Sequence, residues 1–232
     1  MKAEYLQVTG SRHIKEKTLC EDVFWQSSKP PLYYYGLADG QSNKKYCKTG
    51  AEAALKALAG YIFSNDIKRM SEYRYLDEIR YLIIRMIRNA LDELSTLYRT
   101  DISEFSSTIL AYIKDTKSRL YMAVHLGDGC ILGVNKEDEI NMLSAPENGV
   151  FQNHTWLTTS EDALEHLHIR FGSTSAYNRI VMMTDGAECL CKGKNIRLRA
   201  RDLLAFGCTD ELRKYVMEAE PKDDATVVLI NN

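Results

Sequence analysis

The sequence predicts an α+β fold in which antiparallel sheets are covered by helices. Strand signals fill most of the first forty residues, two long amphipathic helices follow between residues 50 and 98, and strand signals then return. This order does not alternate strand with helix, as a doubly wound parallel sheet would. The chain contains no internal repeat, low-complexity segment or obvious linker, so we expect one domain spanning residues 1–232.

The first half of the chain divides into short strands and two helices. Residues 7–10 and 23–27 are predicted to form strands that flank a charged turn, and residues 33–38 form an aromatic and apolar strand ended by an Asp-Gly turn. Residues 50–63 contain strong helix formers with apolar positions three and four apart. Residues 76–98 keep a single apolar stripe, which predicts a second amphipathic helix.

The second half begins with three strand signals, STILAYIK, RLYMAVHLG and CILGVNK, which predict a three-stranded antiparallel meander. Residues 143–178 are polar and are expected to form a loop, a short helix with Ser160 as its N-cap, and an edge strand. A strand IVMM, a helix over about residues 200–219 and a last strand TVVLI complete the prediction.

The bulk composition is that of a globular protein. Hydrophobic residues make up 45% and charged residues 27%, and the formal net charge of −2 gives no electrostatic reason to expect a nucleic-acid partner. No apolar stretch approaches the roughly 20 residues that span a bilayer, and the N-terminal residues lack the apolar core of a signal peptide. We therefore expect a cytoplasmic protein without a membrane partner. Its six cysteines show no paired CxxC spacing and are predicted to be reduced thiols.

Aspartates recur at the ends of the apolar strands. Asp39, Asp128 and Asp185 each follow a hydrophobic run and precede a glycine, whereas Asp223 and Asp224 precede the last run. An antiparallel final strand would bring its beginning to the edge where the other strands finish. A turn alone can explain any single Asp-Gly pair. The repetition instead predicts one acidic cluster gathered from four distant segments.

Such a cluster implies a bound cation, because crowded carboxylates raise one another's pKa unless positive charge offsets them. Oxygen ligands without Cys or His at ligand spacing favour Mg²⁺ or Mn²⁺ over zinc. Two such ions can hold a bridging water and orient it for in-line attack on a phosphate ester. The pattern therefore predicts phosphate hydrolysis without a covalent intermediate.

Six motifs carry a resemblance to a known family: GSRHIKEKTLCEDVF, LADGQSNKKYCKTGAEAAL, SSTILAY, VHLGDGCILGV, IVMMTDGAE and KDDATVVLI. In order and approximate spacing they resemble the metal-dependent PPM (2C-type) serine/threonine protein phosphatases, from about Gly10 to Ile230. The chain is most similar to a compact bacterial branch whose first motif places a His before a Cys-acid-Asp segment.

The resemblance implies two central antiparallel sheets with helices on both outer faces and a centre of two Mn²⁺ or Mg²⁺ ions. Asp39 would bridge the two metals, and Gly40 would contribute its backbone carbonyl. Asp185 and Asp223 would complete the ligands of the first metal. Asp128 would be the ligand of a third, weaker metal site.

The remaining site residues are also implied by the resemblance. Glu21 and Asp22 would hold waters bound to the metals. Asp224 stands where many relatives have Asn, and either a supporting role or a solvated turn acid fits it. Arg12, His13 and Lys44 compete for contact with the phosphate or for its orientation, with a purely structural role as the alternative for His13.

One departure from the family pattern concerns proton donation. Many eukaryotic-type relatives carry a His after the first Asp-Gly, proposed as general acid, and Gln41 stands there in this sequence. Gln has no acidic proton to donate at neutral pH. Two further residues, His166 and His168, are two positions apart, so on one helix they would lie on different faces and form no metal pair.

Together these observations predict a cytoplasmic, Mn²⁺/Mg²⁺-dependent serine/threonine phosphatase that acts on phosphorylated proteins and counteracts a Ser/Thr kinase. Two alternatives remain open. The first is a weak or inactive phosphatase fold that serves as a regulatory or protein-binding module, which Gln41 motivates. The second is a hydrolase of small phosphate esters. The presence of Asp39, Asp185 and Asp223 together favours an active enzyme.

Overall fold

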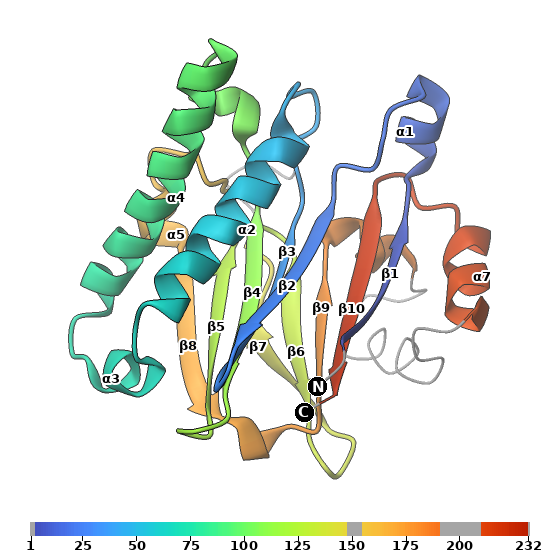
Figure 1. Ribbon diagram of the computed structural model, residues 1–232. Coiled ribbons are helices and arrows are strands. Elements are labelled where there is room, and N and C mark those ends of the chain that lie inside the picture. Colours follow the sequence, from blue (N-terminus) through green and yellow to red (C-terminus); the bar gives the residue numbers. More distant parts are fainter. Residues whose placement is uncertain (1–2, 148–154, 191–209, 232) are drawn as a thin grey trace.

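The computed structural model describes residues 3–147, 155–190 and 210–231. Two five-stranded sheets face each other, and every neighbouring pair of strands within them is antiparallel (Figure 1). The first sheet has the order β2 (Val23–Lys29), β3 (Leu32–Ala38), β4 (Ile109–Asp115), β5 (Leu120–Leu126), β8 (His168–Ser173). The second has the order β1 (Ala3–Val8), β10 (Ala225–Asn231), β9 (Arg179–Met183), β6 (Cys130–Val134), β7 (Ile140–Ser144).

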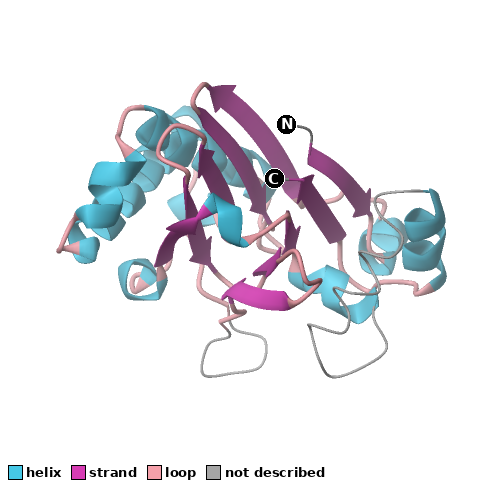
Figure 2. Cartoon of the chain, turned by 90° about the horizontal axis from the view of Figure 1, so that it is seen from below, coloured by secondary structure: helices cyan, strands magenta, loops and turns pink. Residues whose placement is uncertain are grey.

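Helices cover both outer faces of this pair of sheets, as Figure 2 shows from below. The helices α2 (Cys47–Phe63) and α4 (Leu76–Tyr98) pack together over the first sheet, and α7 (Asp210–Glu218) packs beside β1 on the second. This arrangement confirms the predicted αββα architecture. No helix in the described part of the chain combines the length and the apolar composition needed to cross a bilayer.

The short helical segments connect these layers. They are α1 (Ser11–Glu16), α3 (Ile67–Glu72), α5 (Ala163–His166) and the 3₁₀ turns η1 (Ile102–Phe105), η2 (Thr174–Ala176) and η3 (Asp185–Leu190).

Three clusters of buried apolar side chains fill the spaces between the layers. The predicted stripe of α4, with Ile79, Ile83, Ile87 and Leu91 buried, packs with α2 over the first sheet. A second cluster fills the space between the sheets, and a third joins the second sheet to α7. Burial of one large aliphatic side chain contributes about 1.5–3 kcal/mol, so these layers hold the strand ends in fixed positions.

The charged segment predicted as a turn after the first strand is the helix α1. Its last turn closes at Lys17, which adopts the left-handed conformation with φ 57°. The sequence analysis also missed α3. Asp66 is its N-cap and accepts hydrogen bonds from the amides of Lys68 and Arg69, a local signal that the sequence does contain.

The predicted three-stranded meander is wrong at its third strand. β4 and β5 pair as expected, but β6 leaves for the other sheet, where it lies between β7 and β9. Gly127 between β5 and β6 has φ 119°, a conformation that favours glycine and allows the chain to change direction there. β5 pairs instead with the edge strand β8.

The region after β7 follows the prediction in outline, with a short helix and an edge strand. The helix starts at Ala163, however, and Ser160 does not cap it. The Ser160 hydroxyl accepts a hydrogen bond from the amide of Leu157 and so closes the preceding turn. Of the helix predicted over residues 200–219, the described part is α7, and residues 200–209 lie outside the described residues.

Cysteine chemistry agrees with the prediction where it can be seen. Cys20, Cys47 and Cys130 are buried, and Cys20 and Cys47 are free thiols. The side chains of Cys189, Cys191 and Cys208 lie outside the described part of the chain.

His166 and His168 do not occupy two faces of one helix. His166 ends α5 and His168 begins β8, and both bond to the carboxylate of Glu147, at 2.7 Å and 2.6 Å. His168 lies opposite His125 of β5, whose Nδ1 is 2.5 Å from the hydroxyl oxygen of Ser144 in the second sheet. These polar contacts join the two sheets at the β7–β8 side.

Two glycines of α2 provide a test of how closely this helix packs against its neighbours. A Cβ on Gly50 would lie 2.0 Å from the carbonyl oxygen of Phe105, whereas a Cβ on Gly60 would meet no atom within 4 Å. Gly50→Ala is expected to lower the free energy of unfolding by about 1–3 kcal/mol through overpacking. Gly60→Ala is expected to raise it by about 0.5–1 kcal/mol through helix propensity. Urea denaturation checks both, and equal effects in the two variants would contradict this packing.

His125 predicts a specific pH dependence of stability. Burial lowers its pKa from 6.5 to about 4. Folding therefore disfavours the protonated ring, so no penalty exists above pH 6.5 and a penalty of about 3 kcal/mol develops as the pH falls from 6.5 to 4. His125→Gln removes this titration. Urea denaturation at pH 7.5, 5.5 and 4.5 measures the free energy of unfolding of both proteins. The difference between wild type and variant should shift in the variant's favour as the pH falls. A difference that stays constant with pH would refute the lowered pKa of His125.

Candidate active site

The strand directions bring the predicted aspartates to one edge of the sandwich. β3 and β5 are both antiparallel to β4, so they end on the same side, just before Asp39 and Asp128. β10 begins where β9 ends, because Val227 lies opposite Met183 in an antiparallel register. Asp223 and Asp224 therefore stand next to Asp185, as the sequence analysis predicted for an antiparallel last strand.

Asp128 lies at the point where the chain crosses between the sheets. It follows the end of β5 and precedes β6, whose first residue, Cys130, pairs with Met183 at the end of β9. Thr155 donates a hydrogen bond to the Asp128 carboxylate. The crossover that the meander prediction missed is thus what places Asp128 between the two sheets.

A cleft of about 780 Å³ opens at this edge. Its walls include Asp39, Gly40, Asp128, Asp185 and Asp223, together with Arg12, Gln41 and Lys44. The remaining lining is mostly hydroxyl-bearing: Ser42, Ser103, Ser106, Thr108, Thr155, Thr159 and Ser160. Four other candidate residues, His13, Glu21, Asp22 and Asp224, do not line the cleft, and they lie behind or beside it.

Asp39 is the electrostatic centre of the cleft. Loss of solvation raises the pKa of its carboxyl well above the ordinary value, and the charges of Asp22, Asp185, Asp223 and Asp128 raise it further. Its amide donates to the hydroxyl of Thr108 at 2.9 Å, which fixes the backbone beside the last residue of β3. Such a group is costly to ionise without a compensating cation.

Asp22 lies beneath the aspartates that form the acidic floor of the cleft, and it is 1% exposed. Its Oδ2 accepts hydrogen bonds from the hydroxyls of Thr226 at 2.6 Å and Thr184 at 3.0 Å. Its Oδ1 is buried with no hydrogen-bond partner among the described residues. Burial raises the pKa of Asp22 to about 7 despite these two hydroxyl donors.

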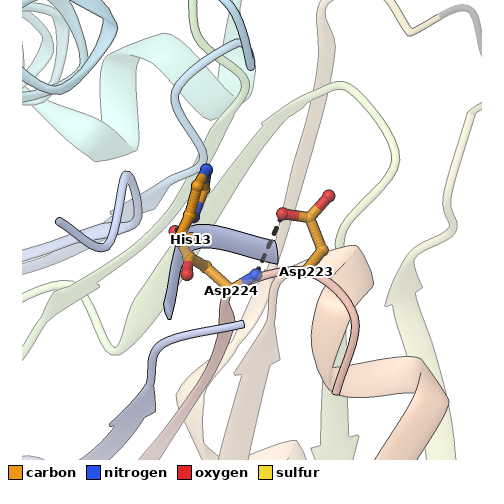
Figure 3. Close-up of side chains that lie close together, drawn as sticks. All are labelled: His13, Asp223 and Asp224. Atoms are coloured by element: carbon orange, nitrogen blue, oxygen red, sulfur yellow. Dashed lines mark hydrogen bonds and ion pairs between the residues drawn. The ribbon is translucent and has the colours of Figure 1, made fainter. Parts of the chain in front are cut away.

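Asp224 is a buried structural acceptor and not a solvated turn acid, since it is 2% exposed. Its oxygens accept hydrogen bonds from the amides of Gly10 at 2.8 Å and Glu21 at 2.6 Å. The second oxygen also lies 2.8 Å from Nδ1 of His13. Figure 3 shows His13 directly against Asp224, with the Asp224 amide bonded to the Asp223 carboxylate. Asp224 therefore ties the segment before β2 to the segment before β10.

His13 is 3% exposed, and both of its ring nitrogens face polar groups. Besides Asp224, it approaches Glu21, with 3.3 Å between Nε2 and Oε2. The two carboxylates raise the pKa of His13 although burial acts in the opposite direction. This environment fits the structural alternative for His13, because a phosphate in the cleft would not reach a buried ring.

Arg12, by contrast, lies at the cleft wall. Its guanidinium donates to the hydroxyl of Ser42 at 2.5 Å and to Asp223 at 3.1 Å, and its side chain is 39% exposed. It is thus held in place while part of its charge remains open to the cleft.

The potential metal ligands are not preassembled into one tight shell. Among the described residues, one group of three ligand atoms lies within 4.8 Å of one another, and it comprises His13, Asp223 and Asp224. Asp39 and Asp185 stand outside that group although both line the cleft. Because Asp224 and His13 already bond to each other, we attribute a supporting role to that pair.

Two glycines beside the acidic cluster, Gly10 and Gly186, are required by close packing rather than by a turn conformation. A Cβ on Gly186 would lie 1.9 Å from the carbonyl oxygen of Asp224, and one on Gly10 would lie 2.4 Å from the carbonyl carbon of Asp223. Among the described glycines, φ is positive at Gly127 alone. The glycines therefore allow three segments to meet tightly behind the acidic cluster.

Sequence reasoning missed the threonines that support the acids. Thr184 and Thr226 bond Asp22, Thr108 accepts from the amide of Asp39, and Thr155 bonds Asp128. A signal existed for two of them, since Thr184 and Thr226 are polar positions next to or within otherwise apolar buried strands.

Neighbouring aspartates should respond differently to mutation. Asp224→Ala leaves two amides and His13 without their buried acceptor and should lower the free energy of unfolding by about 1–3 kcal/mol per unsatisfied group. Asp223→Ala removes a carboxylate whose side chain is 38% exposed, and its exposed ion pair contributes at most about 1 kcal/mol. Urea denaturation in EDTA measures both, and comparable losses would contradict the buried-clamp role of Asp224.

Comparison with known proteins agrees with this geometry. No curated protein matches the sequence. Among solved structures, a point mutant of a bacterial serine phosphatase superposes with a TM-score of 0.68 at 14% identity, covering 100% of this chain and 98% of that one. Stp1 from Staphylococcus aureus gives 0.65 at 12%, with coverage of 100% and 94%. The catalytic domain of PstP in complex with two manganese ions gives 0.65 at 13%, with coverage of 99% and 97%.

These structures share the fold at low sequence identity, and the sequence itself matches a family model. The model described as Protein phosphatase 2C covers residues 9–222, which is nearly the whole chain. The chain that builds this acidic cleft therefore belongs to the protein phosphatase 2C family.

Proposed function

We propose that this protein is a Mn²⁺- or Mg²⁺-dependent phosphatase that hydrolyses phosphoserine and phosphothreonine esters of protein substrates. The observation that carries the proposal is the cleft with Asp39 at its centre, where four other aspartates raise the pKa of one carboxyl. Membership of the protein phosphatase 2C family supports it. In this proposal residues 1–232 form one catalytic domain that counteracts a Ser/Thr kinase in the cytoplasm.

The residues of the cleft fit divalent cations. Asp39, Asp185 and Asp223 offer hard oxygen ligands, Gly40 offers its carbonyl oxygen, and Asp128 offers a further carboxylate for a third ion. The orphaned Oδ1 of buried Asp22 and the raised pKa of Asp39 are both the marks of a site built for positive charge. Among relatives of the same fold, PstP is in complex with two manganese ions and RsbX with magnesium. When bound, such ions activate water and offset the charge of a phosphate ester.

The protein's own groups have separable roles in the reaction. Arg12, fixed by Ser42 and Asp223, would contact the phosphate oxygens, because a guanidinium pairs well with them. Glu21 and Asp22 would orient waters bound to the metals from behind the aspartates that line the cleft. His13 and Asp224 would act as positioning residues that hold the Asp223 carboxylate and the backbone of Glu21 in place.

Gln41 is the observation that favours a second candidate function. It lines the cleft where a general acid would stand, and its backbone N–H donates a hydrogen bond to the carbonyl oxygen of Ser106 at 2.9 Å. If no other group donates a proton to the leaving oxygen, turnover of alkyl phosphates would be slow, and the protein would serve as a binding module. Aryl esters, whose leaving group needs less protonation, would then be hydrolysed better than phosphothreonine.

The deciding experiment compares p-nitrophenyl phosphate with phosphothreonine peptides in Mn²⁺, Mg²⁺ or EDTA. The proposed function predicts turnover of the peptides that EDTA abolishes, with kcat/KM above that of the aryl ester. Manganese binding without any turnover would refute the enzyme assignment in favour of a regulatory module. Turnover confined to small esters would refute the protein-phosphatase assignment.

Asp39→Asn separates cation binding from folding. Manganese should raise the Tm of the wild type, because a ligand that binds only the native state stabilises it. In the variant the manganese-dependent increase in Tm should vanish, and kcat should fall by about 10²–10³-fold, which is the scale for loss of one principal electrostatic group. The Tm in EDTA should be equal to or above that of the wild type, since one of five repelling charges is removed. A variant that retained the manganese response would contradict the metal-ligand role of Asp39.

A further inference from the structure

A second groove, of about 630 Å³, runs beside the cleft between α1 and the start of α2. The two hollows share Arg12, Ser42, Asn43 and Lys44, so they are continuous with each other. We call it the basic groove after its five cationic lining residues: Arg12, Lys17, Lys44, Lys45 and Lys48.

The charges of the basic groove are only partly neutralised. Three acidic residues also line it, but Glu104 is occupied by Lys44, at 3.6 Å, and by the amide of Lys45, at 2.9 Å. Glu21 faces buried His13. Only Glu16 remains exposed among the acidic residues that line the groove.

Three lysines of the basic groove are not paired with an acidic side chain among the described residues. Lys17, Lys45 and Lys48 are exposed, and none of them forms an ion pair with another described residue. The ammonium of Lys48 donates to the carbonyl oxygen of Cys20 at 2.8 Å, which orients it without cancelling its charge. This concentration of positive charge stands out in a chain whose formal net charge is −2.

Apart from Arg12 and Lys44, the described lining of the cleft contains no cationic residue. Between residues 155 and 160 the lining is neutral: Thr155, Leu157, Thr159 and Ser160. An extended substrate with its phosphate in the cleft would therefore meet a concentration of cations only where its chain continues into the basic groove, on one side of the phosphorylated residue. Leu19, which is 80% exposed at the basic groove, offers an apolar contact on the cationic side.

We propose that the basic groove binds an acidic segment next to the phosphorylated residue, so that the preferred substrates are phosphoproteins with Asp or Glu on one side of the phosphoserine or phosphothreonine. This inference rests on the proposed function for the chemistry of the cleft. It goes further because it names the substrate class and attributes the selection of these substrates to residues that bind no metal. The charge complementarity of Lys17, Lys45 and Lys48 carries it.

The test uses phosphothreonine peptides with three glutamates before the phosphorylated residue, three glutamates after it, or glutamines at all six positions. One acidic peptide should show a kcat/KM about tenfold above that of the glutamine peptide, because close pairs of opposite charges attract one another even in water. Added salt should reduce this ratio, since the lysines are exposed. The other acidic peptide should resemble the glutamine peptide.

Lys17→Glu/Lys45→Glu should lower the ratio of acidic to glutamine peptide to 1 or below. The matched control is Lys117→Glu/Lys136→Glu, which changes the net charge equally in exposed turns at the far ends of β5 and β6. The control should keep the wild-type ratio. Because the two peptides are compared within each variant, any general effect of the substitutions on activity or folding cancels in the ratio.

Fluorescence anisotropy with the same labelled peptides in EDTA gives a second readout that does not depend on turnover. Tighter binding of one acidic peptide, lost in Lys17→Glu/Lys45→Glu, supports the inference even if catalysis is slow. Equal binding and equal turnover of the acidic and glutamine peptides would overturn it while leaving the phosphatase assignment intact. Absence of turnover with every peptide would instead refute the proposed function. Sedimentation with phosphatidylserine vesicles that depends on these lysines, without a preference for acidic peptides, would overturn the inference in favour of a membrane surface.

Discussion

Repulsion among carboxylates held at one edge of the sandwich is the constraint around which the site is built. Asp39 experiences the charges of four other aspartates, and each arrives from a different segment of the chain. The apolar layers between and around the sheets must therefore hold together groups that separate in water. A cation at this edge would turn the same repulsion into attraction, which is why the proposed metal site lies there.

Behind the repelling acids lies a second layer, in which buried acids accept hydrogen bonds from protein groups. Asp224 accepts from two amides and contacts His13, and Asp22 accepts from Thr184 and Thr226. Gly10 and Gly186 let the backbones that carry these groups approach to distances that any side chain would block. The supporting layer fixes the floor of the cleft, and Asp39, Asp185 and Asp223 line the cleft itself.

The surroundings of the cleft divide according to charge. The cleft has an acidic floor and many neutral hydroxyls in the rest of its lining, and the basic groove continues from it past Arg12 and Lys44. In the proposed enzyme the floor would hold cations, Arg12 would meet the phosphate, and the lysines beyond it would meet the flanking residues of the substrate. Selection of substrates and chemistry would then depend on different side chains, which is why they can be tested separately.

Local sequence determined the elements whose signals lie within a single segment. The apolar stripe of residues 76–98 gave a helix with those same bounds, because its burial depends on a 3.6-residue period alone. The Asp residues that follow β3, β5 and β9 were likewise visible, since each marks the end of a continuous apolar run. Family membership followed from the order of six such motifs. Tertiary structure alone decided that β6 crosses to the second sheet, that His166 and His168 converge on Glu147, and that buried Asp224 supports its neighbour Asp223. These outcomes depend on which distant backbone and side chain fills each space, and contacts between residues as far apart as Gly10 and Asp224 leave no periodic trace in the sequence.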